Sequence, residues 1–457
     1  MPGAQRGQRD DGRTQKGSHP MAIHNTETSS HTRQPRQLAV RLGCAAGQVI
    51  EVYDFTLYAY FAVFLAPQFF PARSEVASLL ATFAGLLSTF ISRPIGAIII
   101  GHFADRLGRR KILAITIFGA SAAAAVCGVL PTAASMGVAA PILLVLARLS
   151  LGVFIGGEVP AAGAMALEQS SPRHRAFSAS WVQVGATAGS ILALLVATVL
   201  SSVLPHDAMA SWGWRVAFLF AAPLGVIGWF VRSRLTETPE FRQIEDQGAV
   251  ARAPIVELVT NRRHLGQILR MMGIFLCGSF FAFYVFLTYV PTYLLGHTHL
   301  GEHATFSSAL IAQCFMMCVI PLSGRLADRF GRRPILFAAQ ALFVILAVPV
   351  FLLMDLRTFA FILVAQLAIV VPIGLHQGVQ TPIMLELLPT RIRVTGGGLA
   401  FALASALFGG TAPIIAVWLV GRTGTGMSVA VAVIVAAIIS FGVTVATAET
   451  GRRELAA

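Results

Sequence analysis

The stretch Gly101-His-Phe-Ala-Asp105-Arg106-Leu-Gly108-Arg109-Arg110 returns later in this chain as Gly324-Arg-Leu-Ala-Asp328-Arg329-Phe-Gly331-Arg332-Arg333. Both copies follow the pattern Gly-x-x-x-Asp-Arg-x-Gly-Arg-Arg, and they start about half a chain length apart. A weaker pair of similar stretches follows them, with these residues: Glu168, Pro172 and Arg175 in the first, and Glu386, Pro389, Arg391 and Arg393 in the second. The chain therefore consists of two similar halves.

The composition is that of a membrane protein. Of the 457 residues, 56% are hydrophobic and only 12% are charged, whereas a soluble domain carries about 25% charged residues. The apolar residues form blocks such as Val76–Ile100 and Met427–Thr447, close to the ~20 residues that cross a ~30 Å hydrocarbon core. Because lipid cannot hydrogen-bond to an open backbone, a helix is the simplest structure for each block.

The sequence thus predicts an all-α membrane protein with about twelve transmembrane helices in two pseudo-symmetric six-helix bundles. The predicted spans are residues 42–66, 76–100, 111–131, 142–166, 177–202, 212–233, 268–293, 304–324, 334–354, 358–384, 394–420 and 427–447. The predicted domains are a disordered tail (1–39), a first bundle (40–233), a central loop (234–267), a second bundle (268–450) and a short tail (451–457). Met21 is an alternative start to Met1.

The formal charge of +13 is spread over the loops between alternate apolar blocks. This distribution follows the positive-inside rule and predicts that both termini lie in the cytoplasm. The expected location of the chain is the bacterial inner membrane. A nucleic-acid-binding surface would instead gather its basic residues on one soluble face, so we expect no nucleic-acid partner. The five cysteines lie inside apolar blocks without metal-ligand spacing, and we expect no metal.

The repeated loop resembles the signature cytoplasmic loop of the major facilitator superfamily. Further stretches are similar to its metabolite–proton symporter branch: Glu51-Val-Tyr-Asp54-Phe55, Arg93-Pro-Ile-Gly96, Gly156-Gly-Glu158 and Trp212-Gly-Trp-Arg215. Within that branch, the amino-acid sequences of residues 388–396 and 406–413 most resemble those of citrate–proton symporters. Leu151 departs from the family pattern, which usually has Gln there.

The resemblance implies a transporter that is not an enzyme, works by alternating access, functions as a monomer and needs no cofactor beyond the coupling proton. Physically, the loop glycines allow close helix approach, and the aspartates can cap or pair to form a latch that breaks during transport. The predicted gating residues are Gly101, Asp105, Arg106, Gly108, Arg109, Gly324, Asp328, Arg329, Gly331 and Arg332.

Three carboxyl groups interrupt apolar spans and are candidates for proton coupling. Glu51 and Asp54 lie three residues apart, on one face of a helix, where burial and mutual repulsion favour the protonated form. Glu158 follows two glycines in the fourth span and is the third candidate. Ionisable groups at such depth normally face a cavity or a partner, so static pairing with an arginine is the alternative for each.

Two membrane arginines are candidates for substrate binding. Arg93 lies about 12 Å into the membrane, and its planar fork could bind a carboxylate, together with Arg148. Pairing of these arginines with Glu51, Asp54 or Glu158 is the competing interpretation. Tyr284, His376 and Gln377 are further candidate substrate contacts, against the simpler interpretation of core or interfacial packing.

These features predict a proton-coupled importer of a small organic acid, with citrate or a related tricarboxylate as the main hypothesis. Symport of 2-oxoglutarate, shikimate or a zwitterionic osmolyte such as proline or betaine is the alternative. A drug–proton antiporter is disfavoured because Gly185-Ala-Thr-Ala-Gly189 replaces the Gly-Pro pair expected in its fifth span. The expected partners are the lipid bilayer and a small anionic substrate.

Overall fold

The computed structural model describes residues 28–72, 75–234, 254–297 and 302–451, and within these ranges it is helical without β-strands. Eleven helical segments of this described part are long and apolar enough to cross a membrane. The prediction of an all-α membrane protein is therefore confirmed.

The first half contains helices α1 to α11. Their bounds are α1 Thr28–Tyr60, α2 Ala62–Phe69, α3 Glu75–Leu107, α4 Arg109–Val129, α5 Ala133–Met136, α6 Ala139–Gly156, α7 Glu158–Glu168, α8 Arg175–Val203, α9 His206–Ala208, α10 Trp214–Leu219 and α11 Ala221–Ser233.

The second half is preceded by the short helix α13. The bounds are α13 Pro254–Thr260, α14 Arg262–Phe275, α15 Ala282–Tyr284, α16 Val290–His297, α17 Glu302–Phe330, α18 Arg332–Asp355, α19 Phe359–Glu386, α20 Arg393–Ala404, α21 Ala412–Thr423 and α22 Met427–Val445. Wider π-helical turns join α14 to α15, α15 to α16, and α20 to α21.

The first predicted span differs most from the structure. Helix α1 starts at Thr28, so residues 28–39 are helical rather than part of a disordered tail. Extending a formed helix requires no new nucleation, and the Arg, Gln and Leu residues of this stretch favour a helix, whereas Pro35 disfavours it. Residues 1–27 lie outside the described part. Helix α1 is not among these eleven segments. It is less apolar than they are, because Arg41, Glu51 and Asp54 interrupt it.

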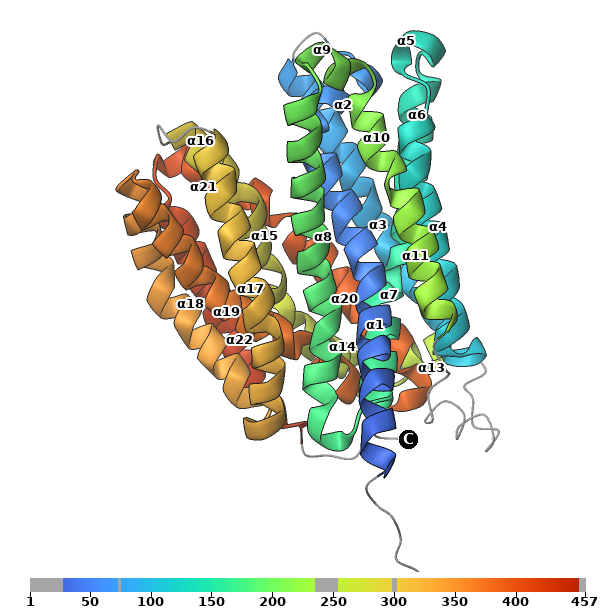
Figure 1. Cartoon of the computed structure of the whole chain (residues 1–457). Coiled ribbons are helices and arrows are strands. Elements are labelled where there is room, and N and C mark those ends of the chain that lie inside the picture. Colours follow the sequence, from blue (N-terminus) through green and yellow to red (C-terminus); the bar gives the residue numbers. More distant parts are fainter. Residues whose placement is uncertain (1–27, 73–74, 235–253, 298–301, 452–457) are drawn as a thin grey trace, which may run out of the picture.

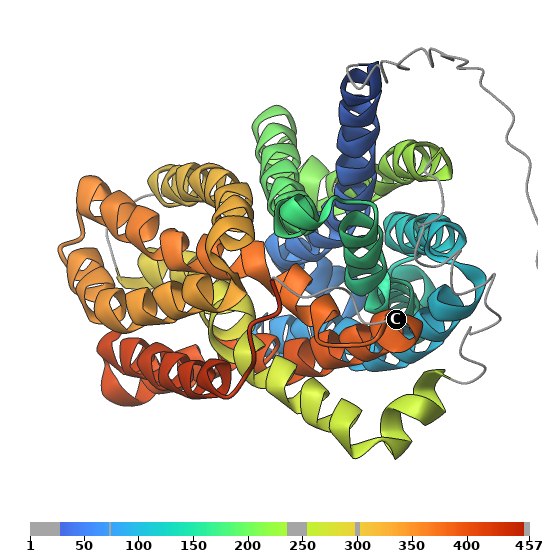
Figure 2. The same cartoon turned by 90° about the horizontal axis from the view of Figure 1, so that it is seen from below.

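Of the predicted central loop (234–267), the structure describes residue 234 and residues 254–267, and the latter contain α13 and the start of α14. Figure 2 shows these two helices at the rim of the molecule seen from below. Figure 1 shows the helices of the two halves approaching each other toward the end where α7, α13 and α14 lie, and diverging toward α2 and α16. We call the former the loop end, because both repeated loops (101–110 and 324–333) lie there; it is the predicted cytoplasmic end.

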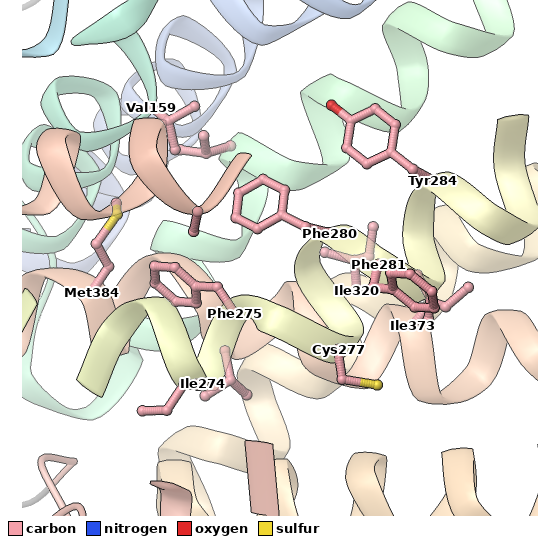
Figure 3. Close-up of a cluster of buried hydrophobic side chains, with 14 of the residues drawn as sticks. Val159, Ile274, Phe275, Cys277, Phe280, Phe281, Tyr284, Ile320, Ile373 and Met384 are labelled. Carbon is pink, nitrogen blue, oxygen red and sulfur yellow. The ribbon is translucent and has the colours of Figure 1, made fainter. Parts of the chain in front are cut away.

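One apolar cluster joins the two halves. Val159 of α7 belongs to the same cluster as Phe275, Phe280 and Met384 of the second half (Figure 3). Glycines let the helices of the first half come equally close. A Cβ on Gly156 of α6 would lie 2.6 Å from the backbone nitrogen of Ala97 in α3, nearer than packed atoms allow. This tight packing fixes the position of the charged residues that α1, α3 and α6 carry.

Candidate functional site

A buried ion pair connects α1 and α3 near the middle of the first half. Arg93 Nη2 lies 2.9 Å from Glu51 Oε1, and each side chain is 6% exposed. Gln48 Nε2 donates a second hydrogen bond of 2.6 Å to Glu51 Oε2. The structure thus shows the pairing that competed with substrate binding by Arg93.

A second ion pair connects α1 and α6. Arg148 donates to both oxygens of Asp54, with distances of 2.5 and 3.0 Å, and is fully buried. Its guanidinium also lies 4.6 Å from the ring centroid of Tyr58, and Nη2 contacts Cys127 Sγ at 2.9 Å. Arg148 thus binds both oxygens of its acid, whereas Arg93 contacts only one oxygen of Glu51.

The third ion pair joins Glu158 of α7 to Arg232 of α11. Arg232 also donates to the carbonyl oxygens of Gly43 and Leu113, both at 2.9 Å, and Thr116 donates to Glu158 at 2.8 Å. The pairing of Glu158 with Arg148, one of the alternatives derived from the sequence, is therefore wrong. Arg148 is already occupied by Asp54, and Arg232 reaches Glu158 from the end of the sixth span.

The role of Arg232 was not predicted from the sequence. An arginine at the end of a span is expected to lie at the cytoplasmic surface of the membrane, according to the positive-inside rule. The structure shows how closely α1 approaches this pair at Gly47. A Cβ there would collide with both Glu158 and Arg232, so a residue larger than glycine is excluded beside this pair.

Tyr284, in α15 of the second half, lies next to the Glu51–Arg93 pair of the first half. Its hydroxyl lies close enough to Arg93 for the two groups to interact electrostatically. Its ring contacts those of Phe55 and Phe90, with centroid distances of 5.8 and 6.0 Å, and these two rings lie 5.5 Å apart. We call Phe55, Phe90 and Tyr284 the aromatic triad. Figure 3 shows the Tyr284 hydroxyl pointing away from Phe281 and Ile320 of its own half.

The aromatic triad covers the ion pair on the side opposite the loop end. Phe55 lies one turn beyond Glu51 along α1, and Phe90 lies one turn before Arg93 along α3, which runs in the opposite direction. The triad also contributes a cation–π contact, since Arg93 lies 4.6 Å from the Phe90 ring centroid.

His376 and Gln377 are buried in α19. His376 Nε2 donates to the carbonyl oxygen of Ile274 (3.1 Å), so Nδ1 is the acceptor for the Ser279 hydroxyl (3.0 Å). Both partners belong to the seventh span. The contacts of His376 thus hold two spans of the second half together, and the structure adds no direct contact between this pair and Glu51 or Arg93 within the described residues.

The two repeated loops latch the halves together at the loop end. Asp105 of α3 accepts hydrogen bonds from the backbone nitrogen of Thr395 (2.9 Å) and from its hydroxyl (2.8 Å), at the start of α20. Asp328 of α17 accepts from the backbone nitrogens of Ala176 and Phe177 (2.9 Å each), at the start of α8. Each aspartate thus caps the N-terminus of a helix in the other half.

The loop glycines make these latches possible. A Cβ on Gly101 would lie 2.7 Å from Thr395 Cα, and one on Gly324 would lie 2.9 Å from Phe177 Cα. Gly108 and Gly331 adopt φ values of +95° and +106°, a region that favours glycine.

The loop arginines have different surroundings. Arg332 pairs with Asp328 (3.2 Å) and Glu386 (2.8 Å). Arg106 lies on the surface near His102, and Arg329 on the surface over Phe330. The side chain of Arg109 lies outside the described part. A fully buried pair between Glu168 and Arg393 (2.8 Å) adds a third link between the halves, which the sequence hinted at only through the weaker repeat.

Comparison with known proteins decides the family. A family model described as Major Facilitator Superfamily matches residues 44–413. The chain belongs to the major facilitator superfamily. It is 33% identical to the proline/betaine transporter of Salmonella typhimurium over 418 residues, which cover 90% of this chain and 83% of that protein. It is 32% identical to the citrate-proton symporter of Klebsiella pneumoniae, over 84% of this chain and 85% of that protein.

The fold agrees with this assignment. The structure of the proton:xylose symporter XylE superposes with a TM-score of 0.74 and 18% identity, over 93% of this chain and 98% of that chain. As a member of this superfamily with bacterial transporters as relatives, the chain is a multi-pass inner-membrane transporter and not an enzyme. The predicted likeness to citrate–proton symporters holds at the level of the family, but the proline/betaine transporter is at least as similar.

Proposed function

We propose that this facilitator is a proton-coupled symporter for a small zwitterion with a carboxylate and an N-substituted ammonium group, of the proline or betaine type. The observation that carries the proposal is the meeting of Arg93, Glu51 and the aromatic triad at the contact between the two halves. The name of the proline/betaine transporter to which the chain is similar supports the same substrate class.

Arg93 is the group that would receive the substrate carboxylate. A guanidinium can bind a carboxylate with two parallel hydrogen bonds, and in the structure Arg93 contacts Glu51 through one nitrogen, Nη2. A substrate carboxylate that binds Arg93 would break the Glu51–Arg93 ion pair and leave Glu51 as an unpaired buried carboxylate. This raises the free energy unless a proton neutralises Glu51. This competition would couple one proton to each carboxylate that binds.

The aromatic triad is the group that would receive the ammonium end. Aromatic rings attract quaternary and N-alkylated ammonium groups through cation–π interactions, and a desolvated contact contributes about 2 kcal/mol. Phe55 and Phe90 lie in the first half and Tyr284 in the second, so a substrate between them would touch both halves. The latches at the loop end would open when the loaded halves rock about this site.

A second candidate is the organic acid of the sequence-based prediction, citrate or a related tricarboxylate. The competition for Arg93 favours it as well, because it requires only a carboxylate. The Klebsiella pneumoniae relative is named a citrate-proton symporter. The two candidates differ in charge. A zwitterion with one proton carries a net positive charge, whereas an acid whose charges are matched by protons carries none.

Proteoliposomes can separate these candidates. We expect an inward proton gradient to drive accumulation of proline or glycine betaine, and an inside-negative potassium diffusion potential to raise the rate further. Citrate accumulation that does not respond to the potential would support the second candidate instead. Efflux driven by inward protons, or no coupled movement of either substrate class, would contradict the proposal of symport.

A further inference from the structure

A groove with a volume of about 540 Å³ lies between α4, α6 and α11 in the first half. Helix α4 packs against both α6 and α11, and Figure 1 shows the three helices together at one side of the molecule. Small residues of α4, such as Ala114 and Ala122, line the groove and leave space between larger neighbours. Of these neighbours, Phe118 and Trp229 are 61% and 47% exposed. The groove is therefore open toward the lipid.

The lining of the groove is apolar. Its one hydroxyl, that of Ser150 in α6, donates to the carbonyl oxygen of Leu146 in its own helix at 2.9 Å. An apolar groove inside a bilayer offers no partners to water, so hydrocarbon fills it. From Ala114 to Val126 it follows α4 for about 18 Å, and one leaflet of a ~30 Å hydrocarbon core is about 15 Å deep. The groove thus has the length of one acyl chain.

The end of the groove nearest the loop end is flanked by two basic side chains. Lys111 lies one turn before Ile115 on the same face of α4, and Ile115 lines the groove. Arg234 directly follows α11. The two helix ends are in contact, because Arg110 Nη2 donates to the carbonyl oxygen of Ser233 at 2.6 Å. An acyl chain in the groove would therefore end beside Lys111 and Arg234.

The charges of Lys111 and Arg234 are available to a ligand. Both side chains are exposed, and within the described residues neither forms an ion pair with a carboxylate. Arg234 is oriented by the ring of Phe230, whose centroid lies 4.2 Å from its Cζ. Basic side chains at the cytoplasmic ends of membrane helices attract the negative headgroups of anionic lipids.

We propose that the groove is a binding site for an anionic phospholipid, with one acyl chain along α4 and the headgroup phosphate at Lys111 and Arg234. This occupant matches both the apolar lining and the positive charge at one end. It would hold together α4 and α11, which supply Thr116 and Arg232 to the buried contacts of Glu158. The lipid would thus stabilise the first half, and the inference does not depend on the proposed substrate.

Native mass spectrometry of the purified full-length protein counts bound lipids directly. The protein is titrated in one detergent with phosphatidylglycerol or with phosphatidylcholine of the same acyl chains. We expect the first phosphatidylglycerol to bind with a Kd about threefold lower or more, because basic side chains near the headgroup favour an anionic lipid. It should also raise the apparent unfolding temperature more than phosphatidylcholine does, since the lipid stabilises the folded state to which it binds.

The groove is tested by filling it. Ala122→Leu places a larger side chain in the groove and should weaken binding of both lipids about fivefold or more, because fewer methylene groups can be buried there. Ser150→Leu fills the groove from α6 and should have the same effect, so it replaces Ala122→Leu if that variant does not fold. Ala338→Leu is the matched control, since Ala338 is also an exposed alanine of a membrane span, in α18 of the second half. It should bind both lipids as the wild type does.

The headgroup contacts are tested separately. The double variant Lys111→Gln and Arg234→Gln should lose the preference for phosphatidylglycerol and keep the wild-type affinity for phosphatidylcholine. Arg422→Gln is the control. Arg422 is also exposed and lies near a ring, that of Trp418 at 5.9 Å, but it belongs to the end of α21 away from the loop end. This variant should keep the preference.

Three results would each overturn the proposal. The first is equal affinity of the wild type for the two lipids, or a preference that survives in the double variant. The second is lipid binding that neither Ala122→Leu nor Ser150→Leu weakens. The third is a dimer of the wild type that carries no lipid and that Ala122→Leu converts to monomer, because the groove would then be a contact between two copies of the chain.

Discussion

The carboxylate of Asp105, in the first half, accepts both the backbone N–H and the hydroxyl of Thr395, in the second half, at distances of 2.9 and 2.8 Å. Asp328 makes the equivalent contact in the reverse direction, to the start of α8. The loop end is therefore closed by two helix caps, each of which places a negative charge at the positive end of a helix dipole.

Removing the charge from one cap should open the loop end more often. Asp105→Asn keeps the size of the side chain but loses the charge-assisted bonds, which contribute about 1.5 kcal/mol or more. Thr381 of α19 is fully buried and accepts a hydrogen bond from Gln183 of the first half, so a cysteine introduced as Thr381→Cys reports opening of this contact. We expect its alkylation from the loop side to rise about tenfold, because 1.4 kcal/mol is a factor of ten in population. Asp207→Asn is the control. Asp207 is an exposed residue of α9, at the end of the molecule away from the loop end, so this change should leave the rate unchanged. Equal rates in all three proteins would show that the cap does not hold this end closed.

The two halves, their helices and these latches could be predicted from the sequence, because each depends on a local pattern. A block of about 20 apolar residues indicates a membrane-spanning helix, and a loop repeated at half the chain length indicates a repeated bundle. The partners of the buried charges could not be predicted in this way. Glu51, Asp54 and Glu158 had Arg93 and Arg148 as evident partners, and nothing in the sequence distinguished Arg232, which is fully buried, from the exposed Arg234 two residues later.

Glu51 and Asp54 should give different phenotypes although they lie one turn apart. Asp54→Asn leaves the fully buried Arg148 without its acid, and breaking such a pair costs about 3–5 kcal/mol. We therefore expect a lower apparent unfolding temperature and little folded protein. Glu51→Gln frees Arg93, which keeps its contacts with Tyr284 and Phe90. We expect this variant to fold, to exchange substrate across the membrane, and to lose at least tenfold in proton-driven accumulation.

Substrate counterflow and proton-driven uptake in proteoliposomes separate these two effects. Counterflow needs only substrate binding and reorientation, so it should persist in Glu51→Gln and fail in Asp54→Asn. Full proton-driven accumulation by Glu51→Gln would remove Glu51 from the coupling mechanism.

The Glu158–Arg232 pair should act as a unit in stability. Either single change, Glu158→Gln or Arg232→Met, leaves one buried charge unpaired and should cost about 3–5 kcal/mol. The double variant removes both charges and should recover most of this loss, since a buried pair is often replaceable by apolar residues of similar volume. The measurement is the apparent unfolding temperature of the four proteins in one detergent. Losses that simply add in the double variant would mean that the two residues do not stabilise each other.

The glycines of the helix contacts should be far less tolerant than glycines facing lipid. Gly156→Ala places a Cβ against the backbone of α3, where neither atom can move without shifting a helix. Gly442→Ala in α22 meets nothing within 4 Å and gains helix propensity of about 1 kcal/mol. We expect the first to lower the apparent unfolding temperature and the yield of folded protein, and the second to be neutral or stabilising. Similar behaviour of both would show that α3 and α6 do not pack at this distance.

Glu449 gives a prediction about pH. It follows α22 and accepts from the backbone nitrogens of Arg332 (2.8 Å) and Arg333 (3.0 Å) at the start of α18, and from Gly451 (2.8 Å). Burial raises the pKa of Glu449, but these backbone donors outweigh it and hold the pKa below its ordinary value. A carboxyl whose pKa is lowered by folding stabilises the folded state above its unfolded pKa of about 4.3, and this contribution is lost as the pH falls through the folded value. The wild-type protein should therefore unfold at a higher temperature than Glu449→Gln at pH 6, and the two should converge as the pH falls below about 4.3. A difference that grows on acidification would contradict the capping role, since protonation can only weaken an acceptor that caps a helix.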